Sequence, residues 1–306
     1  MALRWLPVTG VFRIKGSRIT FLGGEIPLVE TTGSAVGIAM CDQQFSGGTL
    51  AADVTFGELD SSSICNIVFW YNPERQYFVS AGIARDHQAM FGIWQFDSRW
   101  TSHFAGGSGA NLESGRKYHL EVQLRGSRAT LTVDGVRVAA ASLPFTLPPS
   151  QVGIWCRSRG EIIVENFSVE SETPRVFVVM QFGSPFDELH RDVLKTVCRE
   201  FHLEANRADE TFGPGLIVAD IERQIQEAKF VIADITPANP NVFYEVGYAR
   251  AINKPTILLA DRSVTKLPFD VSPFRTLFYE NTIAGKTIVE EGLRRHIRAV
   301  LSNTIL

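Results

Sequence analysis

The stretch Phe230-Val-Ile-Ala-Asp234, followed after a short loop by Asn239-Pro-Asn-Val-Phe-Tyr-Glu-Val-Gly-Tyr-Ala249, decides the fold of the second half of the chain. An apolar run that ends in an aspartate is typical of a strand covered on both faces, with its polar end at the edge of a sheet. Asn239 or Asn241 can cap a following helix. The stretch therefore predicts a buried β-strand that leads through a short loop into an α-helix.

The flanking regions repeat this alternation of strand and helix. Together they predict a flavodoxin-like, doubly wound parallel sheet with strand order 2-1-3-4-5. In such sheets a ligand binds beyond the carboxyl ends of the first and third strands, where the strand order reverses. Apart from the stretch above, the predicted strands are Val176–Phe182, Leu203–Asn206, Thr256–Ala260 and Arg275–Tyr279, and the predicted helices are Phe186–Phe201, Leu216–Ala228, Val242–Ile252 and Thr287–Leu301.

The first half has a different pattern, with short alternating runs separated by glycine-bearing turns, as in an antiparallel β-sandwich of jelly-roll type. Asp134-Gly135 predicts a two-residue hairpin turn, because Gly tolerates a positive φ. All five Trp residues precede the polar segment Glu170-Ser-Glu-Thr-Pro174. We therefore expect two domains, 1–171 and 172–306. The predicted strands of the first are Thr49–Phe56, Ile64–Tyr71, Tyr77–Ile83, Met90–Phe96, Tyr118–Arg125, Ala129–Val133, Gly153–Arg157 and Ile162–Val169.

Composition limits the function classes. The chain has 306 residues, a formal net charge of −3 and 45% hydrophobic residues. It lacks the basic excess of a nucleic-acid-binding protein and an apolar run long enough to span a membrane. The opening residues lack the apolar core of a signal peptide, and the four cysteines form no pair motif, so we expect a cytoplasmic protein. The six histidines show no metal spacing, so we expect no metal site.

Two carboxylates lie where the predicted crevice opens. Asp234 ends its strand, where it can accept hydrogen bonds from a ligand. Glu245 falls within about the first turn of the following helix, where the helix dipole favours an ionised carboxylate, and Tyr248 lies on the same side three residues later. Each carboxylate also has a purely structural interpretation, with Asp234 as a strand-end cap and Glu245 as a solvated helix residue.

Residues 176–280 resemble the superfamily of nucleoside 2-deoxyribosyltransferases and nucleotide N-glycoside hydrolases. They also resemble the Toll/interleukin-1-receptor-like (TIR-like) domains of bacterial defence systems. The loop Asn239-Pro240-Asn241 departs from the glycine-containing loop of the transferases, which leaves open the choice between transfer and hydrolysis. The matching pieces are Phe177-Val-Val-Met-Gln-Phe182, Arg207-Ala-Asp-Glu210, Ile225–Asp234, Asn239–Ala249, Lys254-Pro255 and Pro268-Phe-Asp270.

The resemblance implies a role for each residue of the crevice. Glu245 would attack or stabilise the anomeric carbon of a ribose or deoxyribose, and Asp234 would orient the ribose or base. Asn241 would hold a sugar hydroxyl. The further substrate-binding candidates are Gly183 and Ser184, whose backbone N–H groups would bind a phosphate, Arg207, which would neutralise it, Asp209, which would orient Arg207 or contact substrate, and Phe182, Thr236, Asn239 and Tyr248.

The first half resembles concanavalin-like (laminin-G-like) jelly rolls in the pieces Tyr118-His-Leu-Glu-Val, Val133-Asp-Gly-Val, Val152-Gly-Ile-Trp155 and Val164-Glu-Asn-Phe-Ser-Val169. Such domains often bind carbohydrate or another protein. Trp70, Tyr71, Trp94 and Trp100 are candidates for a sugar-stacking platform, although packing in the core is the favoured interpretation of these aromatic residues.

These features favour an enzyme that cleaves the base–ribose bond of a nucleotide, either NAD or a nucleoside monophosphate. NAD would be its substrate, and no cofactor is expected. The β-sandwich would regulate it, as in an anti-phage defence effector, and the resemblance implies a homo-oligomer. One alternative is a module that binds a nucleotide signal without cleaving it. Another is a carbohydrate-binding protein that acts through the sandwich.

Overall fold

The computed structural model describes residues 3–27, 32–85, 89–210, 217–262 and 275–302. The chain divides into two compact units. The first comprises Met1–Leu124, Arg128–Leu143 and Pro149–Glu172. The second comprises Thr173–Leu306 together with two short segments, Arg125–Ser127 and Pro144–Pro148.

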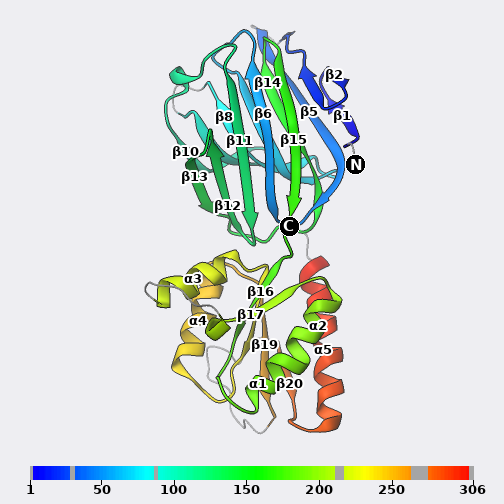
Figure 1. The fold of residues 1–306 in the computed structure, drawn as a ribbon, viewed down its shortest axis with the longest axis vertical. Helices are drawn as coiled ribbons and strands as arrows, with labels where there is room; N and C mark the ends of the chain where they lie inside the picture. The colour runs from blue at the N-terminus through cyan, green and yellow to red at the C-terminus, as the bar shows by residue number, and fades with distance from the viewer. Residues whose placement is uncertain (1–2, 28–31, 86–88, 211–216, 263–274, 303–306) are drawn as a thin grey trace. The chain divides into compact units, whose positions relative to one another are not determined.

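The first unit is an antiparallel β-sandwich (Figure 1). One sheet has eight strands in the order β1-β5-β14-β7-β8-β9-β10, with β4 paired to β5. The other has seven strands in the order β13-β12-β11-β6-β15-β3-β2. The strands are β1 Trp5–Thr9, β2 Phe12–Lys15, β3 Arg18–Phe21, β4 Glu25–Pro27, β5 Thr32–Phe45, β6 Gly48–Phe56, β7 Ile64–Asn72, β8 Tyr77–Ala84, β9 Phe91–Phe96, β10 Trp100–Gly106, β11 Lys117–Arg125, β12 Arg128–Val133, β13 Val136–Ser142, β14 Ser150–Ser158 and β15 Ile162–Ser171.

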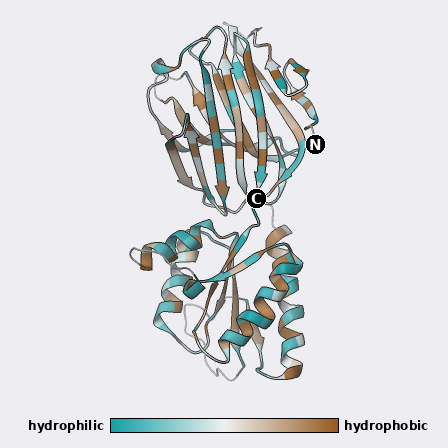
Figure 2. Cartoon of the chain, viewed as in Figure 1, coloured by the Kyte–Doolittle hydropathy of each residue, from teal (hydrophilic) through white to brown (hydrophobic). Residues whose placement is uncertain are grey.

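Alternating burial explains these strands. In β6 every second side chain from Gly48 to Phe56 is buried, because one face of a half-covered strand points into the core. Figure 2 shows the same alternation as bands of hydrophobic and hydrophilic residues along the sandwich strands. The predicted turn at Asp134 and Gly135 is confirmed, with φ of 49° and 77° between the paired residues Val133 and Val136.

All eight strands predicted for this unit exist, with ends that differ by up to three residues. The sequence patterns do not predict β1 to β5, β10 or β13. Five of these, β1, β2, β4, β10 and β13, have mostly or wholly non-buried residues, which weakens the apolar signal on which the prediction depends.

The second unit contains a five-stranded sheet in the order β17-β16-β18-β19-β20, and every strand pair is parallel. In chain order this is 2-1-3-4-5, as the sequence predicts. The strands are β16 Arg175–Val179, β17 Glu204–Arg207, β18 Phe230–Asp234, β19 Thr256–Asp261 and β20 Thr276–Tyr279. All five residues of β18 are buried, as expected for a strand covered on both faces.

Helices cover both faces of this sheet (Figure 1), and a separate hydrophobic cluster lies under each set. One cluster joins Val178, Ile232 and Leu259 to the helices formed by residues 186–200 and by α5. The other cluster joins Val179, Ala233 and Leu258 to the helices α3 and α4 on the opposite face. The helices are α1 Phe186–Glu188, the π-helix η2 Leu189–Leu194, α2 Lys195–Glu200, α3 Ile217–Glu227, α4 Pro240–Ala251 and α5 Ile283–Ser302, with 3₁₀ turns η1 Gly109–Asn111 and η3 Ala208–Glu210.

Three predicted elements of the second unit differ from the structure in helix type or by three or more residues at one end, whereas the ends of the others lie within two residues of the prediction. The first strand, β16, ends at Val179 rather than at the predicted Phe182. Its pairing with β17 ends where Val178 lies opposite Arg207, and the chain then leaves the sheet. The first helix contains a π-turn over η2. The closing helix begins at Ile283, four residues before the predicted start. The piece Pro268-Phe-Asp270 lies outside the described residues.

Candidate active site

The start of α4 is fixed by an asparagine cap. Asn239 has an extended backbone, and its side chain accepts a hydrogen bond of 2.9 Å from the backbone N–H of Asn241. Pro240 occupies the first helical position, where its missing N–H costs nothing. The Asn239 amide also donates a 2.6 Å hydrogen bond to Gln181 Oε1. Of the two caps that the sequence allows, the structure therefore has Asn239, which also ties α4 to the segment after β16.

Glu245 is the sixth residue of α4 and lies in its second turn. The expectation that it lies in the first turn, where the helix dipole would keep it ionised, is wrong. Burial instead raises the pKa of Glu245 to about 7. No ion pair or hydrogen bond compensates this burial within the described part of the chain. Near neutral pH the carboxyl group therefore exists in both protonation states.

Glu245 lines a pocket of about 620 Å³. The pocket is lined by residues at and after the carboxyl ends of β16 and β17, by the start of α3 and by the cap and first turns of α4. Its walls are largely apolar, and the charged residues among those that line it are Asp209 and Glu245. Five predicted site residues meet here: Phe182, Asp209, Asn239, Asn241 and Glu245.

Other residues of this pocket are not predicted from the sequence. Tyr244 is 51% exposed, and its hydroxyl donates a 2.7 Å hydrogen bond to Glu222 of α3. Ile217 and Val218 add exposed apolar surface at 75% and 53%. The position of Tyr244, next to Glu245 on the helix, could have indicated it. The two aliphatic residues begin α3 with an ordinary helical pattern and carry no functional signal.

Asp234 is not among the residues that line this pocket. Its side chain is 1% exposed, and it accepts hydrogen bonds from Tyr279 Oη at 2.5 Å and from the backbone N–H of Thr236 at 3.0 Å. Burial raises the pKa of Asp234 to about 7. A direct contact with a ribose or base is therefore unavailable to Asp234, and the structural interpretation of this residue, as a group that holds the end of its strand, fits the geometry.

Thr236 and Tyr248 form hydrogen bonds to residues outside the pocket of Glu245. Thr236 Oγ1 accepts a 2.9 Å hydrogen bond from the backbone N–H of Asp261, and Thr236 lines a different pocket of about 320 Å³. The Tyr248 hydroxyl accepts a 2.5 Å hydrogen bond from Gln226. Neither residue lines the pocket of Glu245. The prediction that they contact the same ligand as Glu245 is not supported by this geometry.

The predicted phosphate-binding groups are bonded to carboxylates. Arg207 is 6% exposed, and it forms ion pairs with Asp209 at 2.7 Å and Asp187 at 2.8 Å. The backbone N–H of Gly183 donates to Asp187 Oδ1 at 3.2 Å, and Ser184 Oγ donates to Glu188 at 3.2 Å. Asp209 pairs with Arg207, as one of its two predicted roles requires, and it also lines the pocket of Glu245, so contact with a substrate stays a prediction.

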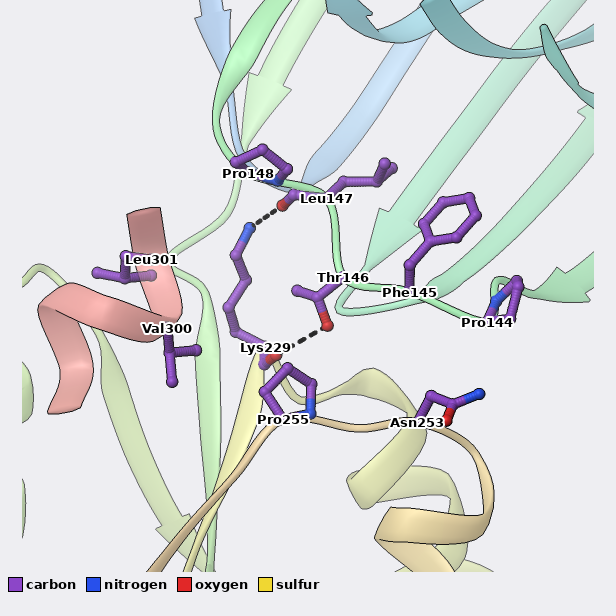
Figure 3. Close-up of a pocket in the computed structure, with 10 residues that line it drawn as sticks. All are labelled: Pro144, Phe145, Thr146, Leu147, Pro148, Lys229, Asn253, Pro255, Val300 and Leu301. Atoms are coloured by element: carbon purple, nitrogen blue, oxygen red, sulfur yellow. Dashed lines mark hydrogen bonds between the residues drawn. The ribbon is translucent and has the colours of Figure 1, made fainter. Parts of the chain in front are cut away.

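The structure also contains a pocket of about 230 Å³ in the second unit (Figure 3). Lys229 Nζ donates a hydrogen bond to the backbone carbonyl of Leu147, and Thr146 Oγ1 donates to the carbonyl of Lys229 at 3.3 Å. Burial lowers the pKa of Lys229 to about 8. This pocket contains none of the residues that the sequence predicts for the site.

Within the described ranges, no group of three or more His, Cys, Asp or Glu side chains is arranged to hold a metal ion. None of the helices that the structure describes is long and apolar enough to cross a membrane. Cys41, Cys65, Cys156 and Cys198 are buried free thiols.

The aromatic candidates of the sandwich do not form one platform. Trp70 and Tyr71 are buried at 5% and 8% exposure, so packing in the core explains them. Trp100 is 46% exposed. Its ring lies edge-on to Phe78 and Trp155, with centroids 5.5 Å and 5.0 Å away. Phe78 and Trp155 belong to a hydrophobic cluster on the eight-stranded sheet. Trp100 therefore packs against this cluster while part of its own side chain stays exposed to solvent.

No protein-family model matches the chain, and no curated protein matches it. Solved structures with similar folds include the carbohydrate binding module CBM66 from Bacillus subtilis, at 14% identity and a TM-score of 0.43, over 54% of this chain and 94% of that one. A Bacillus licheniformis beta-glucanase has 9% identity and a TM-score of 0.38, over 55% and 93% of the two chains. A Bacillus subtilis protein of unknown function with a galectin-like fold has 10% identity and a TM-score of 0.39, over 53% and 87%. Similarity at this level assigns no function to the chain.

Proposed function

We propose that the second unit is a flavodoxin-like enzyme that cleaves the N-glycosidic bond of a nucleoside or nucleotide, with Glu245 as its catalytic carboxylate. The observation that carries the proposal is the position of Glu245 in the wall of a largely apolar pocket of about 620 Å³, with no partner among the described residues. An unpaired, half-buried carboxylate in a concave pocket is typical of a catalytic group rather than of a structural one.

The chemistry uses the ionised form of Glu245. When the bond between C1′ and the base nitrogen breaks, its electron pair leaves with the base, and positive charge develops on the ribose. The carboxylate stabilises this charge or forms a covalent bond to C1′. Attack by water then yields the free sugar, whereas attack by a second base completes a transfer. The apolar walls strengthen the interaction, because a low local dielectric screens the charges less.

Other pocket residues suit binding roles. Asn241, on the first turn of α4, lines the same pocket as Glu245, and we assign its amide to a sugar hydroxyl. Asn239 also lines the pocket, but its amide is bonded to the N–H of Asn241 and to Gln181, so we assign it the role of fixing the start of α4. Phe182 is 51% exposed and offers a flat apolar surface to a base. Asp234 takes a positioning role, since it holds the loop between β18 and α4 through the backbone N–H of Thr236.

The test compares the wild-type protein with Glu245→Gln and with Glu291→Gln, an exposed glutamate on α5. Each is incubated with NAD, NADP, nucleosides and nucleoside monophosphates, and the released base is measured by chromatography. We expect release by the wild type and by Glu291→Gln, and a loss of at least about 100-fold in Glu245→Gln. Equal turnover in Glu245→Gln would show that another group is catalytic. Ligand-dependent thermal stabilisation without turnover by any of the three proteins would favour a nucleotide-binding module.

For the first unit we propose a concanavalin-like jelly roll with a recognition role, in which a glycan or protein partner regulates the enzyme in a homo-oligomeric defence effector. The observation that favours a glycan is Trp100, which is 46% exposed and supported by the rings of Phe78 and Trp155. A sugar ring stacks on an exposed indole that is held in place by other aromatic residues. The same residue would carry the function of a carbohydrate-binding protein that acts through the sandwich alone.

A further inference from the structure

The segment from Phe182 to Asp187 contains the components of an anion site. The backbone of Gly183 has a φ of 93°, and its N–H points to Asp187 Oδ1 at 3.2 Å. Arg207 Nη2 reaches the same oxygen at 2.8 Å. A backbone N–H and a guanidinium that converge on one oxygen are the donors that proteins use for phosphate and carboxylate groups. Here the anion is supplied by the side chain of the protein itself.

The arginine is built into the fold, whereas the carboxylate that it binds lies at the surface. The side chain of Arg207 is 8% exposed and that of Asp187 is 45% exposed. Asp209 holds Arg207 through two bonds of 2.7 Å, from Nε and from Nη2. The Nη1 atom of Arg207 is buried without a hydrogen-bond partner within the described structure. Arg207 therefore has donor capacity that its two carboxylates leave unused.

This group borders the pocket of Glu245. Phe182 and Asp209 both line that pocket, and both contact Arg207, with the ring centroid of Phe182 4.9 Å from the guanidinium carbon. A phosphate on a ligand in the pocket would meet Asp209 in the pocket wall and, next to it, Arg207, which Asp187 already binds. The net charge of Arg207 with its two aspartates is −1, which repels an anion.

We propose that Asp187 is a specificity-determining residue, which occupies the anion position between Gly183 and Arg207 and so excludes phosphorylated ligands from the pocket of Glu245. The substrate class then narrows to an unphosphorylated nucleoside. The statement on substrate rests on the proposed function, whereas the statement on Asp187 concerns anion binding and can be tested without turnover.

The first measurement titrates inorganic phosphate by calorimetry into the wild-type protein, Asp187→Ala and Asp192→Ala. Asp192 is the matched control, since it lies in the same helical segment and pairs with Arg191 at the surface. We expect Asp187→Ala to bind phosphate at least tenfold more tightly than the other two proteins, and Asp187→Ala/Arg207→Gln to lose the gain. Asp187→Asn keeps the size of the side chain and removes its charge, so it provides a folded variant if Asp187→Ala unfolds, and it should also bind phosphate more tightly. Equal phosphate affinity in folded Asp187→Asn, Asp187→Ala and Asp192→Ala would overturn the proposal.

The second measurement compares base release from adenosine and from adenosine 5′-monophosphate. We expect the wild type to prefer the nucleoside and Asp187→Ala to shift the kcat/KM ratio at least tenfold toward the monophosphate. If no protein releases a base, the proposed function fails while the phosphate titration still decides the role of Asp187. If base is released and the ratio stays the same in Asp187→Ala, the specificity proposal fails and the proposed function stands.

Discussion

The hydroxyl of Tyr279, at the end of β20, donates a 2.5 Å hydrogen bond to Asp234 Oδ2, at the end of β18, although β19 lies between the two strands. The bond connects the ends of the two strands that flank β19, at the edge of the sheet where the loop to α4 begins. Asp234 is almost fully buried, so this bond and the N–H of Thr236 replace the water that its carboxyl group loses on folding.

Asp234→Asn is expected to change how stability depends on pH. Burial raises the pKa of Asp234 from 3.8 to about 7, so the folded protein holds a proton that the unfolded chain releases. The contribution of this group is full below about pH 4 and is lost as the pH rises through 7. An asparagine imitates the protonated form at every pH. Between these pH values the unfolding free energy of the wild type should therefore fall by up to about 4 kcal/mol more than that of the variant.

Urea unfolding of both proteins at pH 4, 5.5 and 7 measures this difference. Glu245→Gln serves as a second variant, because burial also raises the pKa of Glu245 to about 7 and the sign is therefore the same. A wild type and an Asp234→Asn variant whose stabilities change in parallel with pH would contradict the assignment of a protonated Asp234.

Base release should follow the ionisation of Glu245. If the carboxylate stabilises the developing charge on the ribose, activity is low where Glu245 is protonated and increases as the pH rises through about 7. The measurement is kcat/KM for the best substrate between pH 5 and 9. Activity that falls over this range would instead indicate that the protonated carboxyl group acts, as a general acid that protonates the leaving base.

Asn239→Ala should destabilise α4. The substitution removes the acceptor for the N–H of Asn241 and the bond to Gln181, and loss of an asparagine cap costs about 1 kcal/mol. Asn241→Ala is the control, since Asn241 contributes its backbone rather than its side chain to the cap. Measured by urea denaturation, the unfolding free energy of Asn239→Ala should be lower than that of Asn241→Ala. Equal values for the two variants would exclude a stabilising cap.

Trp100→Ala should separate binding from stability in the sandwich. Trp100 is 46% exposed, whereas Trp155 is 8% exposed, and truncating a buried aromatic residue costs about 3–5 kcal/mol. We therefore expect Trp155→Ala to lower stability strongly and Trp100→Ala to lower it much less. Oligosaccharides that quench the tryptophan fluorescence of the wild type should no longer bind Trp100→Ala. Unchanged glycan binding in this variant would exclude Trp100 as the platform.

The sequence predicts the arrangement of the second unit because each central strand is a continuous apolar run that only a covered parallel strand accommodates. Phe230–Asp234 has the predicted bounds, and Asn239 caps the predicted helix. The same reasoning brings Phe182, Asp209 and Glu245 to one pocket, because the carboxyl ends of the first strands meet at one edge.

The sequence alone does not predict the protonation state of Glu245 or the ion pairs of Arg207. The state of Glu245 depends on how deeply the neighbouring walls bury it, and the pattern of α4 gives only its position along the helix. Arg207 is a phosphate ligand by residue type, yet Asp187 and Asp209 fold against it. Asp187 lies twenty residues earlier in the chain, and only the pairing of β16 with β17 brings the two regions together.

The position of the asparagine cap also determines the direction in which the side chain of Glu245 faces. An α-helix turns its side chains by about 100° for each residue, so the point at which α4 starts determines which way Glu245 faces. The cap at Asn239 sets that starting point. One residue inserted between Asn239 and Glu245 would rotate the carboxylate by about 100° and take it out of the pocket, while every amino acid of the site stayed in the chain. The distance in sequence between these two residues is therefore as much a part of the site as their identity.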